Sequence, residues 1–168
     1  TSIVDIVMGN PPYNFIFDKR TPVYQLFALR GLEILNENGY INIIIPNAWK
    51  RSYSDNSRTK TGLILDAYKK YYLKYIKLNL DIKHFPNVDV ILLKKTINKQ
   101  NTIVEHSNYP NLYFNDIINE DIRYLPSLIT KETLSIVNNL NNKIGEKLNI
   151  INDRSITNQS RSDFKDEK

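Results

Sequence analysis

Cysteine is absent from this chain of 168 residues, and the only histidines are His84 and His106. Without cysteine there can be no disulfide framework, no thiol nucleophile and no thiolate site for zinc or an iron–sulfur cluster. Two histidines also argue against a histidine-rich metal centre, so no metal is expected. No apolar run approaches the roughly 20 residues that a membrane helix needs, and no signal peptide is recognisable. The sequence therefore predicts a cytoplasmic protein with no membrane partner.

Glycine is scarce as well, with five residues in total, and none stands in the spacing of a glycine-rich phosphate-binding loop. Hydrophobic residues make up 41% and charged residues 24%, which is enough for a packed core and excludes general disorder. The 23 lysines and arginines exceed the 18 acidic residues and give a net charge of +5. This mild excess is compatible with a phosphate backbone as partner but does not demonstrate one.

The N-terminal third reads as strand, helix, strand. Residues 3–9 are mostly β-branched or apolar, as in a buried parallel strand, and the prolines that follow end the pairing. Residues 23–38 repeat apolar side chains at helical spacing, and Ala28 and Gly31 would let this helix approach a sheet closely. Asn38-Gly39 is interpreted as the helix stop, before a second buried strand over 40–45.

The rest of the chain divides into a regular and an irregular part. A helix is predicted over 63–72, and strands over 75–80 and 88–95 should pair antiparallel because their connection is short. Residues 102–105 could add a strand, residues 108–125 read as irregular, and Thr130 could cap a last helix. This order predicts an α/β fold, the C-terminal half of a doubly wound sheet whose last strand is antiparallel.

Two regions follow from this pattern. The first is expected over residues 1–100 and the second over residues 101–168, which begin with a polar linker. Thr1 is not methionine and leads directly into a strand, so the chain is interpreted as part of a longer polypeptide.

One motif lies where α/β sheets bind ligands, beyond the carboxyl end of a strand. The run Asp5-Ile6-Val7-Met8-Gly9-Asn10-Pro11-Pro12-Tyr13 resembles the catalytic motif of S-adenosylmethionine-dependent amino-methyltransferases. It is closest to the γ-type N6-adenine DNA methyltransferases of restriction–modification systems. Residues 26–47 resemble the next helix and the proline-terminated strand of that family, and residues 84–94 its late hairpin. The resemblance covers residue 3 to about residue 96. It implies that residues 1–100 form the C-terminal half of a methyltransferase catalytic domain, and residues 101–168 a linker and the start of a target-recognition region.

The resemblance implies a catalytic role for Asn10, Pro11 and Tyr13. An exocyclic amine is a poor nucleophile because its lone pair is delocalised into the ring. The side-chain oxygen of Asn10 and the carbonyl oxygen of Pro11 would accept hydrogen bonds from its two N–H groups. The nitrogen lone pair would then be less delocalised and available for attack on a methyl group. Tyr13, and by resemblance Phe85, would hold the adenine flipped out of duplex DNA. Asn10 and Pro12 would also border S-adenosylmethionine.

Several residues have plainer alternatives. Tyr13 could only pack a turn, Phe85 could fill the core, and Asp5 is interpreted as structural. Lys50, Arg51 and Arg58 fit phosphate contacts and a solvated loop equally well. The tyrosines of the 63–72 helix favour a core role over a stacking platform. These tyrosines are Tyr68, Tyr71 and Tyr72.

The family's glycine-rich cofactor loop is missing from this sequence. We therefore expect the main cofactor-binding loop in the remaining N-terminal part of the enzyme or in a partner chain, with little cofactor binding by these 168 residues alone. The same motif also serves methyltransferases that modify a glutamine amide in a protein or a guanine amine in ribosomal RNA. A non-catalytic remnant that acts in DNA binding or assembly is a further alternative.

Overall fold

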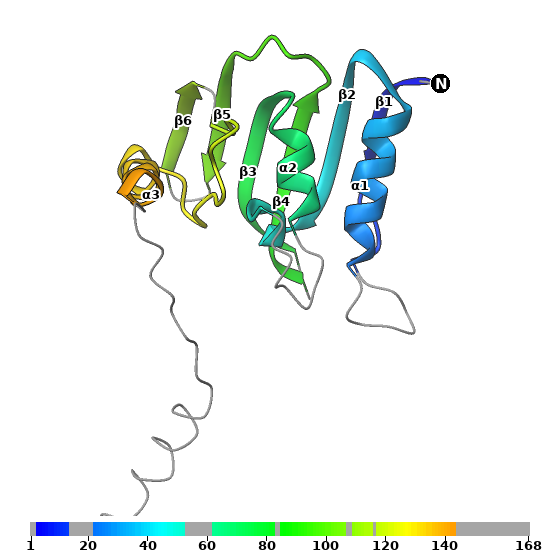
Figure 1. Cartoon of the computed structure of the whole chain (residues 1–168). Helices are drawn as coiled ribbons and strands as arrows, with labels where there is room; N and C mark the ends of the chain where they lie inside the picture. Colours follow the sequence, from blue (N-terminus) through cyan, green and yellow to red (C-terminus); the bar gives the residue numbers. More distant parts are fainter. Residues whose placement is uncertain are drawn as a thin grey trace, which may run out of the picture.

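The computed structural model describes residues 3–13, 22–52, 62–82, 85–106, 109–115 and 117–143. A six-stranded mixed sheet runs through them in the order β1-β2-β4-β3-β5-β6 (Figure 1). The strands are β1 Val4–Gly9, β2 Leu35–Pro46, β3 Tyr72–Ile82, β4 Phe85–Lys94, β5 Asn101–His106 and β6 Tyr109–Asn115. The helices are α1 Val23–Ile34, the 3-10 turn η1 Asn47–Lys50, α2 Leu63–Tyr68 and α3 Lys131–Lys143.

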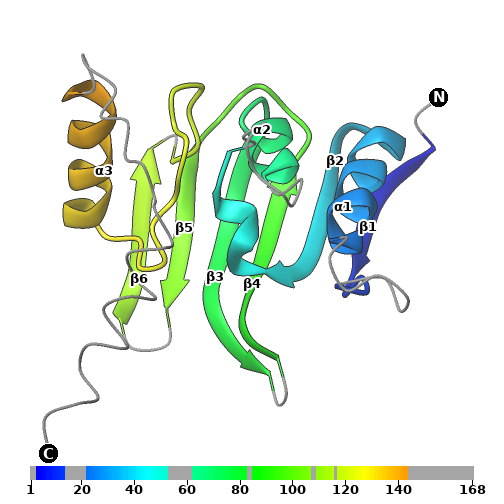
Figure 2. The ribbon, with the colours of Figure 1, turned by 60° about the horizontal axis from the view of Figure 1, so that its bottom comes forward.

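The sheet confirms the predicted α/β class with an antiparallel late strand. β1 pairs parallel with β2, whereas β4 runs antiparallel between β2 and β3. This insertion follows from the short connection between β3 and β4, which can join only antiparallel neighbours. The carboxyl ends of β1, β2 and β3 therefore lie at one end of the strands, where β4 begins. This side of the sheet is called its carboxyl edge, or simply the edge, below. Figure 2 shows the β3–β4 hairpin extending past the end of β2 at this edge.

Helix α1 packs tightly on the first two strands, as its small residues predicted. Ala28 is fully buried. A Cβ added at Gly31 would lie 2.9 Å from Cδ1 of Ile41 and 3.1 Å from Cγ1 of Val7, so a larger residue would require these side chains to shift. The predicted Asn38-Gly39 helix stop is wrong, because α1 ends at Ile34 and both residues belong to β2.

The reason lies in how β2 pairs with its neighbours. The β1–β2 register is irregular between Val4 and Ile6, where β2 has a bulge. Asn38 takes a positive φ of 64°, a conformation that asparagine tolerates, and its N–H donates to the carbonyl of Lys95 over 2.8 Å. The amide of Lys95 returns a bond of 2.9 Å to the carbonyl of Gly39. The Asn-Gly pair thus marks an irregular strand and not a helix end.

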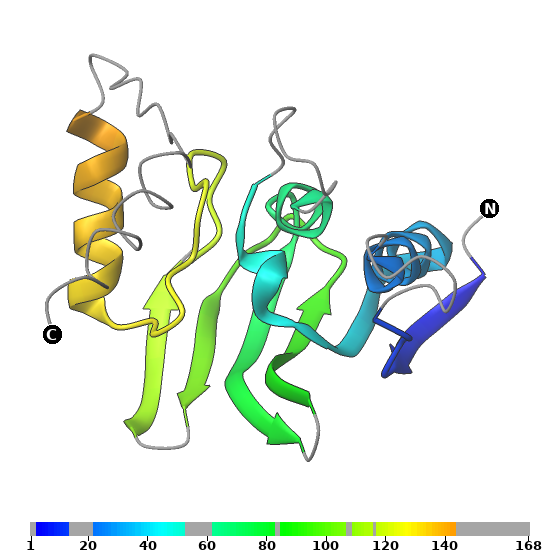
Figure 3. The ribbon, with the colours of Figure 1, turned by 90° about the horizontal axis from the view of Figure 1, so that it is seen from below.

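Helices α1 and α2 lie over one face of the sheet, and α3 lies beside the edge strand β6 (Figure 3). The hydrophobic core fills the space between α1, α2 and the sheet, and alternate residues of β2 point into it, namely Ile41, Ile43 and Ile45. Tyr68 is fully buried there, Tyr71 packs against the core and Tyr72 is 7% exposed. These positions support the core role expected for the three tyrosines.

The segment predicted to be irregular after residue 108 contains strand β6, which pairs antiparallel with β5. Phe114 is buried on this strand. The segment that follows β6 returns over the same side of the sheet as α1 and α2 (yellow in Figure 3). Its buried apolar residues are Ile117, Ile118, Ile122, Leu125 and Ile129. Thr130 caps α3 as predicted, because its Oγ1 accepts the N–H of Thr133 over 3.2 Å. Strands β5 and β6 belong to the same six-stranded sheet as β1 to β4. The division into two regions after residue 100 stays a prediction.

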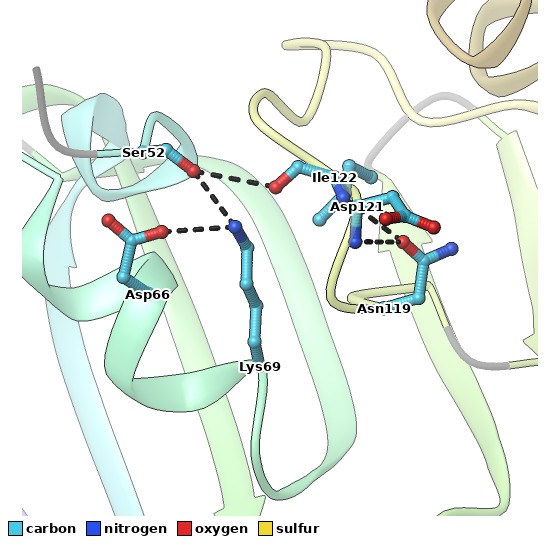
Figure 4. A network of polar contacts seen from close by, with 6 residues as sticks. All are labelled: Ser52, Asp66, Lys69, Asn119, Asp121 and Ile122. Atoms are coloured by element: carbon cyan, nitrogen blue, oxygen red, sulfur yellow. Dashed lines mark hydrogen bonds and ion pairs between the residues drawn. The ribbon is translucent and has the colours of Figure 1, made fainter. Parts of the chain in front are cut away.

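A polar network fastens the returning segment to the first part of the chain (Figure 4). The ammonium of Lys69 lies 3.0 Å from Oγ of Ser52 and 3.0 Å from a carboxylate oxygen of Asp66. Ser52 in turn donates to the carbonyl of Ile122 over 3.4 Å. The side chain of Asn119 accepts the amide of Ile122 over 3.0 Å and so fixes the turn that meets Ser52.

Candidate functional site

Residues 10–13, hereafter the Asn10 loop, follow β1 at the carboxyl edge of the sheet. Asn10 and Pro12 are exposed, whereas Pro11 and Tyr13 are half-buried. Asp5 near the start of β1 accepts a hydrogen bond of 2.8 Å from the amide of Asn36, as its structural interpretation predicted. The strand therefore anchors a loop whose own amide side chain stays open to solvent.

An open cavity of about 300 Å³, hereafter the motif cavity, lies beside this loop. Asn10, Pro11 and Pro12 line it together with apolar groups from β1, α1 and β2. The apolar part consists of Val7, Met8, Gly9, Phe27 and Ile43. Met8 is 72% exposed and Phe27 is 55% exposed, so apolar surface surrounds a single amide side chain. This arrangement suits a flat, mostly apolar group that presents one polar edge.

Tyr13 lies next to the motif cavity but is not among its lining residues. Its ring packs edge-on against Tyr24, with centroids 6.5 Å apart and planes at 86°. Burial raises the pKa of Tyr13, and it raises the pKa of Tyr24 to about 12. The structure thus gives Tyr13 a packing partner, and its contact with a substrate base stays a prediction.

Phe85 begins β4 at the same edge of the sheet, but β2 separates β4 from β1. Val88 of β4 pairs with Pro46, the last residue of β2, so Phe85 lies beyond the end of β2. Its side chain lies outside the described part of the chain, as do His84 and Arg58. The backbone therefore places Phe85 at the same edge as the Asn10 loop but two strands away, and its contact with a base stays a prediction.

The segment after β2 holds an ion pair that sequence reasoning missed. Lys50 is 2% exposed and Asp89 of β4 is fully buried, and Nζ lies 3.0 Å from Oδ2. The indole N–H of Trp49 donates to the same Oδ2 over 2.8 Å. The amide of Asn79, at a positive φ of 51°, donates to Oδ1 over 3.0 Å. Asp89 thereby joins η1, β4 and the irregular part of β3.

This finding overturns both readings of Lys50, which is neither a solvated loop residue nor an exposed phosphate ligand. A signal for it was present in the sequence, because Asp89 stands alone within the apolar strand 88–93. A buried carboxylate needs a cation and hydrogen-bond donors, and the polar residues after the preceding strand were the available source.

Arg51, the next residue, lines a second cavity of about 210 Å³, hereafter the polar cavity. Its guanidinium carbon lies 5.9 Å from the ring centroid of Tyr124. The main chain fixes the same contact, since Leu125 N–H donates to the Lys50 carbonyl and Ser52 N–H to the Arg123 carbonyl, each over 2.8 Å. The segment after β2 and the segment near Tyr124, which are about 70 residues apart in sequence, thus form one wall.

Within the described ranges, no three histidine or acidic side chains come together as a metal site would require. Among the helices described, none has the length and apolar character needed to cross a membrane.

Comparison with known proteins bears directly on the Asn10 loop. Residues 3–76 match the family described as "Eco57I restriction-modification methylase", a span that runs from β1 into β3. The match includes the Asn10 loop, α1, β2 and η1. It confirms the restriction–modification methylase resemblance that the sequence predicted. No curated protein matches the chain.

Several solved structures also match the chain, at low sequence identity. One from a study of complex assembly and conformational transition of the type I R-M system has a TM-score of 0.49 and 12% identity, covering 83% of this chain and 30% of that one. The type I restriction-modification system methyltransferase subunit from Streptococcus thermophilus has a TM-score of 0.45 and 18% identity, covering 82% and 31%. The EcoKI M protein of a type I restriction enzyme has a TM-score of 0.42 and 13% identity, covering 63% and 26%. The chain spans about a third or less of the length of these proteins.

Proposed function

We propose that this chain, whose residues 3–76 match restriction–modification methylases, forms the catalytic end of a DNA methyltransferase that acts on N6 of adenine. The observation that carries the proposal is the motif cavity. Asn10, Pro11 and Pro12 line it together, at the carboxyl end of a parallel strand and open to solvent. Buried or scattered side chains at these positions would have argued against a site for a nucleobase.

Asn10 and Pro11 act on the amine of the target base. The side-chain oxygen of Asn10 accepts one N–H of adenine N6, and the carbonyl oxygen of Pro11 accepts the other. These two bonds favour a pyramidal nitrogen whose lone pair is available for attack. As N6 bonds to the methyl carbon, the carbon–sulfur bond of the methyl donor would break and its electron pair would stay on the departing thioether sulfur. N6 would then release one proton to water. Because the acceptors strengthen as positive charge develops on N6, they stabilise the transition state more than the ground state.

Tyr13 and Phe85 are proposed to hold the adenine once it has left the duplex stack. Tyr24 limits the orientations of the Tyr13 ring, which reduces the entropy lost when a base stacks on it. Phe85 starts β4 at the same sheet edge and would approach from the hairpin side. Stacking of a base on an aromatic ring contributes roughly 1–3 kcal/mol, and this offsets part of the cost of unstacking.

S-Adenosylmethionine supplies the electrophilic methyl group in this reaction. The exposed side chains of Asn10 and Pro12 fit a position at its border, and the apolar wall formed by Phe27 suits its uncharged parts. The five glycines of the sequence do not stand in the spacing of a glycine-rich phosphate- or nucleoside-binding loop. We therefore propose that most of the cofactor contacts come from the rest of the enzyme or a partner chain, and that double-stranded DNA is the other partner.

A methylation assay with the full-length enzyme tests this function. Labelled methyl groups would be followed into duplex DNA, ribosomal RNA and a glutamine-containing peptide, and modified nucleosides would be identified by mass spectrometry. The expected product is N6-methyladenine in duplex DNA. Methylated guanine in RNA, a methylated glutamine amide, or DNA binding without any transfer would each contradict the proposal and identify the alternative that holds.

A further inference from the structure

We propose that the polar cavity binds a phosphate of the DNA strand that carries the target adenine, with Arg51 as the direct ligand. This inference rests on the proposed function and adds a second contact at the same edge of the sheet. The residues that carry it lie in the segment after β2 and near Tyr124, away from the Asn10 loop. They are Asn47, Lys50, Arg51, Tyr124 and Ser127.

The charges around the polar cavity favour an anion. Its lining contains two cations and no acidic side chain. Asp89, behind Lys50, neutralises that cation through their ion pair. Among the residues that the structure describes, no carboxylate pairs with Arg51, so its charge remains for a ligand. Because Nζ of Lys50 is buried, the exposed guanidinium of Arg51 makes the contact.

Arg51 is held in place before any ligand arrives. Its backbone forms an antiparallel bridge with Tyr124, and its guanidinium lies over the ring of the same residue. Its guanidinium carbon lies 5.9 Å from the ring centroid, and a guanidinium in such a contact keeps its N–H groups available for phosphate oxygens. Asn47 and Ser127 add neutral donors at the wall. A cavity of about 210 Å³ has room for a phosphate group, given that one water occupies roughly 30 Å³.

The position of the polar cavity fits a strand that also reaches the Asn10 loop. Gly9 pairs with Ile43, and β2 runs three residues further before η1 begins. Asn47 comes four residues after Ile43, so at about 3.3 Å per residue it lies roughly 13 Å beyond the level of Gly9 at the same edge. A nucleic-acid strand lying across this edge can place a base in the motif cavity and a neighbouring phosphate in the polar cavity.

The experiment measures duplex DNA binding by the full-length enzyme over a series of salt concentrations. Each phosphate contact contributes about 0.9 to the slope of log K against log salt. Arg51→Gln is expected to lower the slope by about 0.9, the value of one phosphate contact, and to weaken binding evenly across DNA sequences. Arg30→Gln removes another exposed cation, which pairs with Glu33 on α1, and should keep the wild-type slope. Tyr124→Phe keeps the ring and should also behave as wild type.

Two outcomes would overturn the inference. An unchanged slope for Arg51→Gln would mean that Arg51 only fastens the segment near Tyr124, in which case the free energy of unfolding alone would fall. A loss confined to one DNA sequence would assign Arg51 to base reading. A second measurement is independent of methylation: inorganic phosphate, against chloride of equal ionic strength, should raise the Tm of the wild type more than that of Arg51→Gln. If the wild type methylates no DNA, this comparison still decides the anion site while the proposed function fails.

Discussion

Two neighbouring segments begin at the same edge of the sheet and differ in the burial of their polar side chains. The Asn10 loop follows β1, and the segment of Asn47 to Ser52 follows β2, its parallel neighbour. Asn10 and Pro12 are exposed above an apolar cavity. Trp49 and Lys50, in contrast, are buried against the carboxylate of Asp89.

The exposed segment is suited to bind a ligand, whereas the buried segment is suited to stabilise the fold. An amide side chain that must accept bonds from a ligand cannot be satisfied inside the protein, so the first segment gains little stability from Asn10. The second segment is fixed through a buried charge, and a main-chain bridge to Tyr124 then presents Arg51. Substitutions in the first segment should therefore change activity without changing folding, and substitutions at Lys50 should do the reverse.

The largest effect is expected for Lys50→Met, which tests the rigid side of the comparison. It removes the cation and leaves Asp89 charged in a site with no exposure. Breaking a buried pair in this way costs about 3–5 kcal/mol in the free energy of unfolding. Urea unfolding of the variant and the wild type measures the loss.

The double variant Lys50→Met, Asp89→Asn is the matched control. It removes both charges and keeps a side-chain oxygen that can accept the amide of Asn79. We expect it to recover part of the lost stability. A loss below about 1 kcal/mol for Lys50→Met, within the range of ordinary surface substitutions, would show that the pair does not stabilise this segment.

Asn10→Ala tests the reactive side. Removing one preorganised group that acts on developing charge lowers kcat by roughly 10²–10³-fold, while an exposed substitution changes stability by less than about 0.5 kcal/mol. The rate of methyl transfer to duplex DNA, DNA affinity and urea unfolding are measured together in the full-length enzyme. Wild-type turnover by this variant would refute the role of Asn10.

Asn98→Ala provides the comparison for that variant. Asn98 is exposed in the connection between β4 and β5, at the opposite edge of the sheet. It should retain both turnover and stability. If it lost turnover to the same extent, the effect of Asn10→Ala would not be specific to the motif cavity.

The same contrast explains how much could be predicted from the sequence. The Asn10 loop was predictable because its features are local: a strand of β-branched residues, two prolines that end it, and a helix with Ala28 and Gly31 that must pack closely. The hairpin of β3 and β4 was also local, since a short connection allows one pairing.

The features that were missed depend on long-range contacts. Lys50 meets Asp89 only because β4 inserts beside β2, and Arg51 meets Tyr124 only because the chain returns over the sheet after β6. The Asn38-Gly39 pair has the local signal of a helix stop, yet its bonds with Lys95 belong to a strand with a bulge. A single sequence does not show which distant residues will satisfy a buried charge or an irregular backbone.

The smallest effect concerns Tyr24, which lies against Tyr13 below the Asn10 loop. Burial raises its pKa to about 12, above the value of about 10 in an unfolded chain. Below pH 10 both states keep the proton, so stability is unaffected. Between pH 10 and 12 the unfolded chain releases the proton while the folded protein retains it, and stability falls by about 1 kcal/mol by pH 11. Urea unfolding at pH 9 and pH 11 should show this loss reduced in Tyr24→Phe, which keeps the ring that contacts Tyr13. An equal loss in both proteins would place Tyr24 in contact with water, and the packing that orients Tyr13 would then be too loose to serve a stacked base.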